Sequence, residues 1–247
     1  MSKVFDSHIH FNMKVNNPIE DFKEQTKNLD GFILILNNSE EKNLFEDEFL
    51  ENFEVLYPLS AIAINYELAA SQFIERMRNL KIKIGIKLHP RLSNISIDKF
   101  KLIAKNLEKL NFDFIIVDCF YYGSSLETHT NLELSIFIAK YFKDHKILLA
   151  HGGGHKVLEF MLFTRDLENV YYDFSFTIAY LRNTSIWLDL INFFRFNEEK
   201  ILFGSDYPEF KISQIRTCYI EVFNEAYNRS TSENVEYLNF RKFLEVE

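Results

Sequence analysis

Histidines and acidic residues stand at the ends of several short apolar segments in this chain of 247 residues. The first segment closes on Asp6-Ser7-His8-Ile9-His10, so its two imidazoles are two residues apart. Side chains at that spacing on a strand point to the same side, with Asp6 behind them. Two neutral imidazoles on one face suit zinc or a similar borderline metal. The alternative is a chance pair of histidines near a chain end.

Two further apolar segments also end in a residue that can do chemistry. Asp206, between Gly204 and Pro208, can cap the next helix, or it can bind a metal and accept a proton from bound water. His151 is followed by three glycines, which let the backbone approach a ligand closely. A phosphate-binding turn is the alternative, but no GxGxxG or Walker spacing is present. We therefore predict that His151 is a base or a ligand.

Short apolar runs that alternate with amphipathic stretches must position these residues. After the fourth run, Phe100, Ile103, Leu107 and Leu110 recur at helical spacing. Such alternation is typical of parallel β–α–β units, with more helix expected from about 211 to 245. The predicted strands lie near residues 3–10, 31–37, 55–64, 82–89, 112–120, 146–151, 169–175 and 200–206.

The fourth run, KIKIGIKLHP, distinguishes a closed barrel from an open sheet. Its isoleucines and Leu88 share one face, whereas its lysines, Gly85 and His89 share the other. An open sheet covered by helices on both sides prefers apolar residues on both faces. A barrel strand turns one face inward, where polar residues can line the mouth. We therefore predict a single (β/α)₈ TIM-barrel domain over residues 1–247, with its active site at the carboxyl ends of the strands.

Composition restricts the partners and the compartment. The formal net charge of −8 argues against a nucleic-acid or anionic-membrane binder, because phosphate contacts need clustered Lys and Arg. Cys119 and Cys218 lack metal-site or CxxC spacing, which indicates a reduced, cytoplasmic setting. No apolar segment resembles a signal peptide or a membrane span. The expected partner is a small-molecule substrate, and a homodimer is compatible with these features.

Four motifs span most of the chain: Asp6-Ser7-His8-Ile9-His10, Gly85-Ile86-Lys87-Leu88-His89-Pro90, Ala150-His151-Gly152-Gly153 and Phe203-Gly204-Ser205-Asp206-Tyr207-Pro208. In this order they resemble the amidohydrolase-related family, in its branch of decarboxylases and lactonases of small carboxylic acids. Asn239 resembles the family's late Asn-containing segment. The resemblance implies that His8, His10 and Asp206 bind a divalent metal. It also implies that His151 is a base or orienting group, and that Lys87 and His89 face the substrate.

The fifth strand departs from the family pattern. Members usually carry a metal-binding histidine at its end, and here Asp118 or Cys119 occupies that place. A carboxylate can bind zinc or manganese, and a thiolate can bind zinc. We predict that Asp118 faces the mouth as a fourth ligand and that Cys119 faces away. The alternative is an ion pair between Asp118 and Lys87. The expected cofactor is one divalent ion, zinc, with manganese or a metal-free site as alternatives.

These residues predict hydrolysis of an amide, ester or lactone bond in a small, carboxylate-bearing molecule by a metal-activated water. Asp206 would take the proton of the water, His151 would polarise the carbonyl, and Lys87 would pair with the substrate carboxylate. The alternatives are a decarboxylase or lactonase of the same family, a deoxyribonuclease with the same barrel, and a barrel that only binds a small molecule. Lys87 as a carbamylated lysine that bridges two metals is a further alternative.

Overall fold

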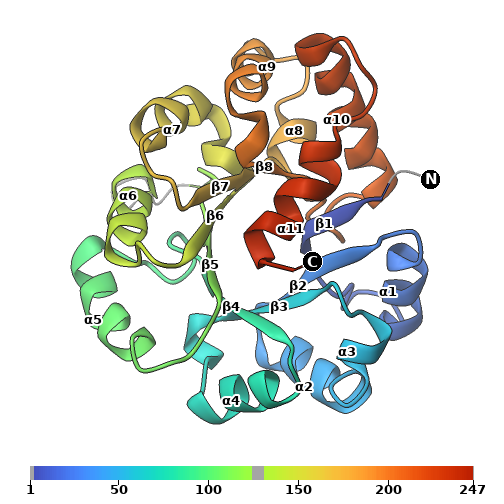
Figure 1. Ribbon diagram of the computed structural model, residues 1–247, viewed down its shortest axis with the longest axis vertical. Coiled ribbons are helices and arrows are strands. Elements are labelled where there is room, and N and C mark those ends of the chain that lie inside the picture. The colour runs from blue at the N-terminus through green and yellow to red at the C-terminus, as the bar shows by residue number, and fades with distance from the viewer. Residues whose placement is uncertain (1–2, 124–130, 247) are drawn as a thin grey trace.

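The computed structural model describes residues 3–123 and 131–246, and within them eight parallel strands form one sheet. Each strand pairs with its neighbour in the chain, from β1 through to β8. Figure 1 shows the strands as a ring with helices around the outside. The predicted barrel is therefore confirmed. The strands are β1 (Phe5–Ile9), β2 (Gly31–Leu36), β3 (Ala61–Asn65), β4 (Lys83–Leu88), β5 (Phe114–Asp118), β6 (Lys146–Ala150), β7 (Val170–Asp173) and β8 (Ile201–Leu202).

Backbone hydrogen bonds beyond the short strand β8 close the ring. The carbonyl of Phe203 accepts from the Ser7 N–H at 2.8 Å, and that of Tyr207 accepts from the His10 N–H at 2.8 Å. The eighth strand is regular over Ile201–Leu202, fewer residues than the sequence predicts, and the chain then turns at Asp206, whose φ is +57°. The same turn carries the Asp206 side chain to the mouth of the barrel.

Helices connect successive strands over the described residues, and the β2–β3 and β7–β8 connections each contain two α-helices. None of the helices that the structure describes is long and apolar enough to cross a membrane. The helices are α1 (Pro18–Thr26), α2 (Ser39–Glu48), α3 (Phe53–Leu56), α4 (Ser71–Asn79), α5 (Ile97–Leu107), α6 (Asn131–Tyr141), α7 (Val157–Thr164), α8 (Thr177–Tyr180), α9 (Ile186–Asn197), α10 (Ile212–Tyr227) and α11 (Asn239–Leu244).

Two predicted elements differ from the structure. The third strand was expected over 55–64, but α3 occupies the first part of that range and β3 begins at Ala61. Phe53 of α3 is buried while Val55 is 76% exposed, so this apolar run packs by one helical face rather than by alternation. The helical region expected from 211 to 245 is also interrupted, because α10 ends at Tyr227 and the next residue, Asn228, takes the left-handed conformation with φ of +55°.

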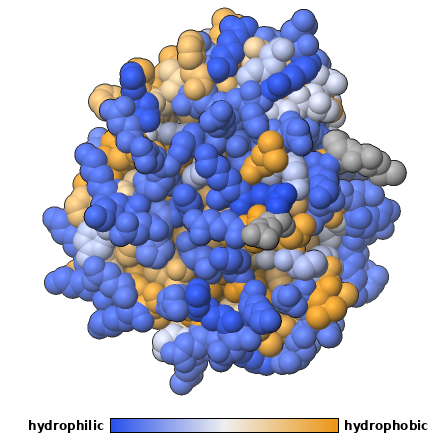
Figure 2. Space-filling view, viewed as in Figure 1, coloured by the Kyte–Doolittle hydropathy of each residue, from blue (hydrophilic) through white to orange (hydrophobic). Residues whose placement is uncertain are grey.

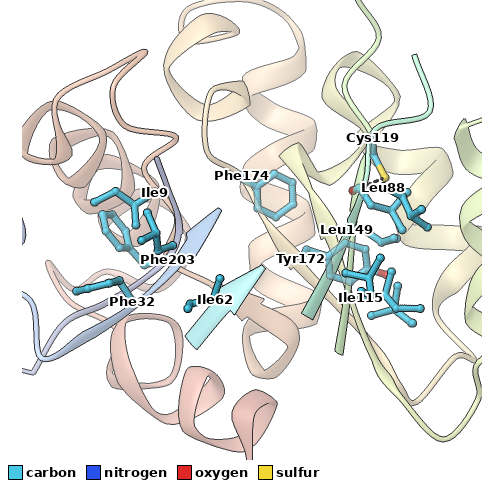
Figure 3. Close-up of a cluster of buried hydrophobic side chains, with 14 of the residues drawn as sticks. Ile9, Phe32, Ile62, Leu88, Ile115, Cys119, Leu149, Tyr172, Phe174 and Phe203 are labelled. Carbon is cyan, nitrogen blue, oxygen red and sulfur yellow. Dashed lines mark hydrogen bonds between the residues drawn. The ribbon is translucent and has the colours of Figure 1, made fainter. Parts of the chain in front are cut away.

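A hydrophobic layer between the strands and the surrounding helices holds the barrel together. Figure 3 shows part of this layer, in which Phe32, Ile62, Leu149 and Phe203 are fully buried. These side chains come from strands or from the segment directly after a strand, and they point outward toward the helices. The opposite faces of the same strands are therefore free to fill the barrel and to line its mouth.

A second hydrophobic cluster closes the amino-terminal end of the barrel. The ring centroids of Phe5 and Phe240 lie 4.7 Å apart, and those of Phe114 and Phe243 lie 5.3 Å apart. Helix α11 supplies Phe240 and Phe243 and lies across this end in Figure 1, and the surface seen from the same side in Figure 2 is mostly hydrophilic. Gly85 leaves room for Phe114, since an added Cβ would lie 2.2 Å from that ring. Sealing this end leaves the carboxyl ends of the strands for the site.

Candidate active site

A cavity of about 520 Å³ opens at the carboxyl ends of the strands. Its lining residues come from β1, β4 and β5 and from the segments that follow β1, β2, β4, β5, β6, β7 and β8. The structure thus brings the predicted site residues together, while their chemical roles stay predictions. The cavity is lined by all seven of them: His8, His10, Lys87, His89, Asp118, His151 and Asp206.

His8, His10 and Asp206 form one group in the cavity wall. The Nε2 atoms of His8 and His10 lie 3.4 Å and 3.6 Å from Oδ1 of Asp206. The N–H of Asp206 donates to the carbonyl of His8 at 2.8 Å, which binds the turn after β8 directly to β1. Positive φ is uncommon for a residue other than glycine, and at Asp206 it turns the carboxylate toward the two imidazoles.

The spacing and the donor types of this group fit a divalent metal ion. Two atoms held tetrahedrally at about 2.1 Å from an ion lie about 3.4 Å apart, close to the distances observed here. Burial raises the pKa of Asp206, but the rings of His8, His10 and His151 outweigh it, and the net shift is downward. Burial lowers the pKa of His8 to about 4. At neutral pH the group therefore offers a carboxylate and a neutral imidazole, as a metal requires.

Asp118 lies in a second group, with two other histidines. Its Oδ2 atom is 3.1 Å from Nε2 of His151 and 3.2 Å from Nε2 of His89. Among the described residues, the ligand atoms of His8, His10 and Asp206 come within 4.8 Å of one another, and Asp118 does not join them. Asp118 also makes no hydrogen bond to Lys87, because Nζ of Lys87 has no hydrogen-bond partner among the described residues. The geometry therefore favours a carboxylate that holds two imidazoles.

His151 is held from both sides of its ring. Its Nδ1 atom lies 3.0 Å from the carbonyl oxygen of Ser175, and its Nε2 atom faces Asp118. Burial alone lowers the pKa of His151, but the charge and hydrogen bond of Asp118 outweigh it and raise the pKa to about 9. A histidine with oxygen acceptors at both nitrogens is a cation whose two N–H groups are engaged, so the geometry favours a fixed positive charge beside the substrate over general-base chemistry.

Packing explains the glycines that follow His151. Gly152 and Gly153 have φ of +55° and +84°. A Cβ at Gly152 would lie 2.1 Å from the ring of Phe174, and one at Gly153 would lie 2.2 Å from the ring of Phe160. Only glycine combines this backbone conformation with so little space. The glycines therefore need no bound phosphate to account for them.

Sequence reasoning missed Asp173 and Ser175. Asp173 ends β7 and is fully buried, with Oδ2 3.3 Å from Nδ1 of His8. The Ser175 hydroxyl lies 3.2 Å from the same nitrogen and 3.1 Å from Nδ1 of His151. The sequence contained a signal for Asp173, because it is an acidic residue at the end of an apolar run, as Asp118 and Asp206 are.

On the β4 side of the cavity, two cationic side chains each have a nitrogen atom without a hydrogen-bond partner among the described residues. Lys87 is 1% exposed, and its Nζ atom has no hydrogen-bond partner among the described residues. The same holds for Nε of Arg91, whose guanidinium lies 5.7 Å from the ring centroid of Tyr122. A buried ammonium without a hydrogen-bond partner is costly, so this side of the cavity is suited to an anionic ligand.

Three other residues that the sequence analysis named make contacts that hold the fold together and do not line the cavity. Oδ1 of Asp6 accepts from the N–H groups of His8 and Ser205, both at 3.0 Å, and so ties β1 to the segment after β8. The Cys119 thiol is buried in the outer layer, and burial raises its pKa. Asn239 donates to the carbonyls of Glu198 and Ile201 at 2.7 Å, away from the mouth.

Comparison with known families identifies the class of protein. The amidohydrolase family model matches residues 39–211, which is more than half of the chain, so the protein belongs to the amidohydrolase family. The resemblance inferred from the sequence motifs is thereby confirmed, and the chain is a hydrolytic enzyme of a family that generally uses metal ions. The match includes Lys87, His89, Asp118, His151 and Asp206. No curated protein sequence matches the chain.

Solved structures share the fold at low sequence identity. A probable 2-pyrone-4,6-dicarboxylic acid hydrolase from Acinetobacter baumannii has a TM-score of 0.64 at 12% identity, over 98% of this chain and 99% of that one. An uncharacterised TIM-barrel protein from Bordetella bronchiseptica has a TM-score of 0.60 at 15% identity, over 92% and 82%. Amidohydrolase 2 from Bifidobacterium longum subsp. infantis has a TM-score of 0.51 at 14% identity, over 100% of both chains.

Proposed function

We propose that the protein is a metal-dependent hydrolase that acts on an amide, ester or lactone bond of a small, carboxylate-bearing molecule. One observation carries the proposal: the group of His8, His10 and Asp206 shares a cavity with the ammonium of Lys87, which has no hydrogen-bond partner among the described residues. One side of the cavity offers ligands for an ion that activates water. The other side offers positive charge for a substrate anion, as in the dicarboxylic acid for which the Acinetobacter baumannii relative is named.

His8, His10 and Asp206 would hold one divalent ion. Two imidazoles and a carboxylate are a ligand set of catalytic zinc sites, which keep a further position open, and manganese is the alternative. When bound, such an ion supplies Lewis acidity and lowers the pKa of a coordinated water from about 16 toward about 7. Asp118 is proposed as a positioning group for His151 and His89 rather than as a fourth ligand, because its Oδ2 contacts both rings.

Three side chains around the proposed ion have separate roles in the reaction. Asp206 is ionised at neutral pH, since its pKa is shifted downward, and its carboxylate can accept a proton from the attacking water. His151, a cation held by Asp118, can polarise the carbonyl of the substrate through its positive charge. Lys87 pairs with a substrate carboxylate, which fixes the orientation of the reacting bond.

Metal content tests the ligand assignment. Purified protein is expected to hold close to one equivalent of divalent ion, and the double variant His8→Ala/His10→Ala is expected to lose it. His145→Ala is the matched control, because this histidine is partly buried near Phe112 and lies outside the cavity. The ligand assignment is wrong if a chelator and the double variant both leave metal content and melting temperature unchanged.

A substrate screen tests the reaction. The metal-loaded enzyme would be assayed with esters, amides, lactones and carboxylated rings, with the hydrolysis products (acid, alcohol or amine) and CO₂ release followed separately. Formation of hydrolysis product that Asp206→Asn abolishes is the expected result. Release of CO₂ without hydrolysis would instead identify a decarboxylase, and tight binding without turnover would identify a barrel that only binds its ligand.

A further inference from the structure

The Ser175 hydroxyl lies between the rings of His8 and His151, behind the cavity wall. Its Oγ atom is 3.2 Å from Nδ1 of His8 and 3.1 Å from Nδ1 of His151. The two ring centroids are 5.0 Å apart. Ser175 and Asp173 are fully buried, and the hydroxyl donates a hydrogen bond to Oδ1 of Asp173. One hydroxyl and one carboxylate therefore contact both histidines out of reach of bulk water.

Hydrogen-bond accounting fixes where the histidine protons lie. A hydroxyl has one proton to donate and two lone pairs, and Ser175 donates its proton to a carboxylate, which can only accept. Toward both rings Ser175 is therefore an acceptor. The other atoms beside the two Nδ1 atoms are acceptors too: Oδ2 of Asp173 at 3.3 Å from His8 and the carbonyl oxygen of Ser175 at 3.0 Å from His151. Each Nδ1 atom consequently carries a proton.

We infer that Ser175 and Asp173 are positioning residues that set the tautomers of His8 and His151 together. With its proton on Nδ1, His8 turns the lone pair of Nε2 toward Oδ1 of Asp206, 3.4 Å away. Nε2 of His8 and Oδ1 of Asp206 are then two hydrogen-bond acceptors with no hydrogen between them. A cation bound between them would remove their repulsion. The inference rests on the proposed function for the ion, but the tautomer is a property of the chain itself.

The same hydroxyl closes a second group of ligand atoms. Atoms of His8, His151 and Asp173 also lie within 4.8 Å of one another, which is close enough to hold a metal. The Ser175 Oγ atom contacts all three residues and so occupies the space among them. Because both Nδ1 atoms carry protons, neither offers a lone pair to an ion. The site therefore takes one metal ion, on the Nε2 side of His8.

Nitrogen NMR of metal-free protein containing ¹⁵N-histidine tests the tautomer, since protonated and unprotonated ring nitrogens have well-separated shifts. His8 of the wild type is expected to be protonated on Nδ1 and bare on Nε2. Ser175→Ala removes one of the acceptors beside Nδ1 of His8. Asp173→Asn can place an amide N–H beside this nitrogen in place of the carboxylate oxygen. Both variants should populate the Nε2-protonated form of His8 and lower zinc affinity by about 10- to 100-fold, the usual effect of losing such a partner.

Two further variants separate positioning from general damage to the fold. Asp118→Asn alters another buried carboxylate of the site, which contacts His151 but not His8, and it should leave the His8 signals unchanged. Ser175→Thr keeps a hydroxyl and should keep the wild-type tautomer and most of the zinc affinity.

Three results would overturn the inference: a wild-type His8 protonated on Nε2, His8 signals that neither Ser175→Ala nor Asp173→Asn changes, or two zinc equivalents in the wild type. A wild type that binds no metal would refute the proposed function. The NMR measurement on that same metal-free protein would still decide the positioning role.

Discussion

The carboxylate of Asp118 lies 3.1 Å from Nε2 of His151 and holds the ring from the side opposite to Ser175. This contact gives Asp118 a role that differs from the fourth-ligand role predicted from its position in the sequence. The resemblance to the family implied a metal-binding histidine at this position, so a ligand was the natural expectation there. Substitution of Asp118 separates the two roles.

Asp118→Asn is expected to lower the pKa of His151 from about 9 toward its ordinary value, because the negative charge of Asp118 is the main cause that raises this pKa. Zinc affinity should change by less than about 10-fold, the lower limit for loss of a partner of a true ligand. NMR titration of His151 and competition with a zinc chelator measure the two quantities. A larger loss that Asp118→His restores would establish Asp118 as a ligand.

The unfolding free energy should depend on pH through His151. Its pKa rises from 6.5 to about 9 on folding, so its stabilisation is complete below the lower value and is lost as the pH rises through the higher one. For a buried group such a shift is worth on the order of 3 kcal/mol. Urea unfolding of metal-free protein between about pH 7 and pH 9 should show this loss in the wild type and a flatter profile in His151→Gln. Parallel profiles would contradict it.

Lys87→Met is expected to stabilise the free protein while weakening anion binding. The substitution removes a buried charge that has no hydrogen-bond partner among the described residues, which should raise the free energy of unfolding by about 1 kcal/mol or more. Affinity for citrate, a carboxylate probe, should fall by at least about 10-fold, the equivalent of one charged hydrogen bond. Urea unfolding and calorimetry measure the two effects.

Lys83→Met is the matched control for that experiment. Lys83 lies on the same strand, but its Nζ atom pairs with Asp113 at 3.3 Å and it lies outside the cavity. This variant should leave citrate binding unchanged and should not stabilise the protein. Equal effects of the two substitutions on citrate affinity would rule out a specific anion site at Lys87.

Asn239→Ala should affect stability and spare the site. The amide of Asn239 donates to two carbonyls at 2.7 Å, and its loss leaves them without those partners, at a cost of about 1–3 kcal/mol. Zinc affinity should be unchanged, because Asn239 does not line the cavity. Thermal unfolding with zinc titration checks both. A loss of zinc affinity in a stably folded variant would instead connect Asn239 to the site.

The sequence alone was sufficient for the barrel and for the histidines, acidic residues and Lys87 that it placed at the mouth. The alternation in β4 puts Lys87 and His89 on the face opposite to Ile86, and this pattern follows from the two-residue period of a strand. Parallel strands carry their carboxyl ends to one side, so a polar residue at each strand end predicts a shared site. Local periodicity therefore revealed His8, His10, His151 and Asp206 without knowledge of any contact.

The tertiary structure alone decided the partners of those residues. Asp118 turned out to bind His151 and His89, and Asp173 and Ser175 to hold His8, through contacts between distant parts of the chain. Periodicity states which way a side chain points, but it does not state which atom it meets across the barrel. That choice depends on strand register, on the turn at Asp206 and on rotamers set by packing, which exist only once the whole ring has closed.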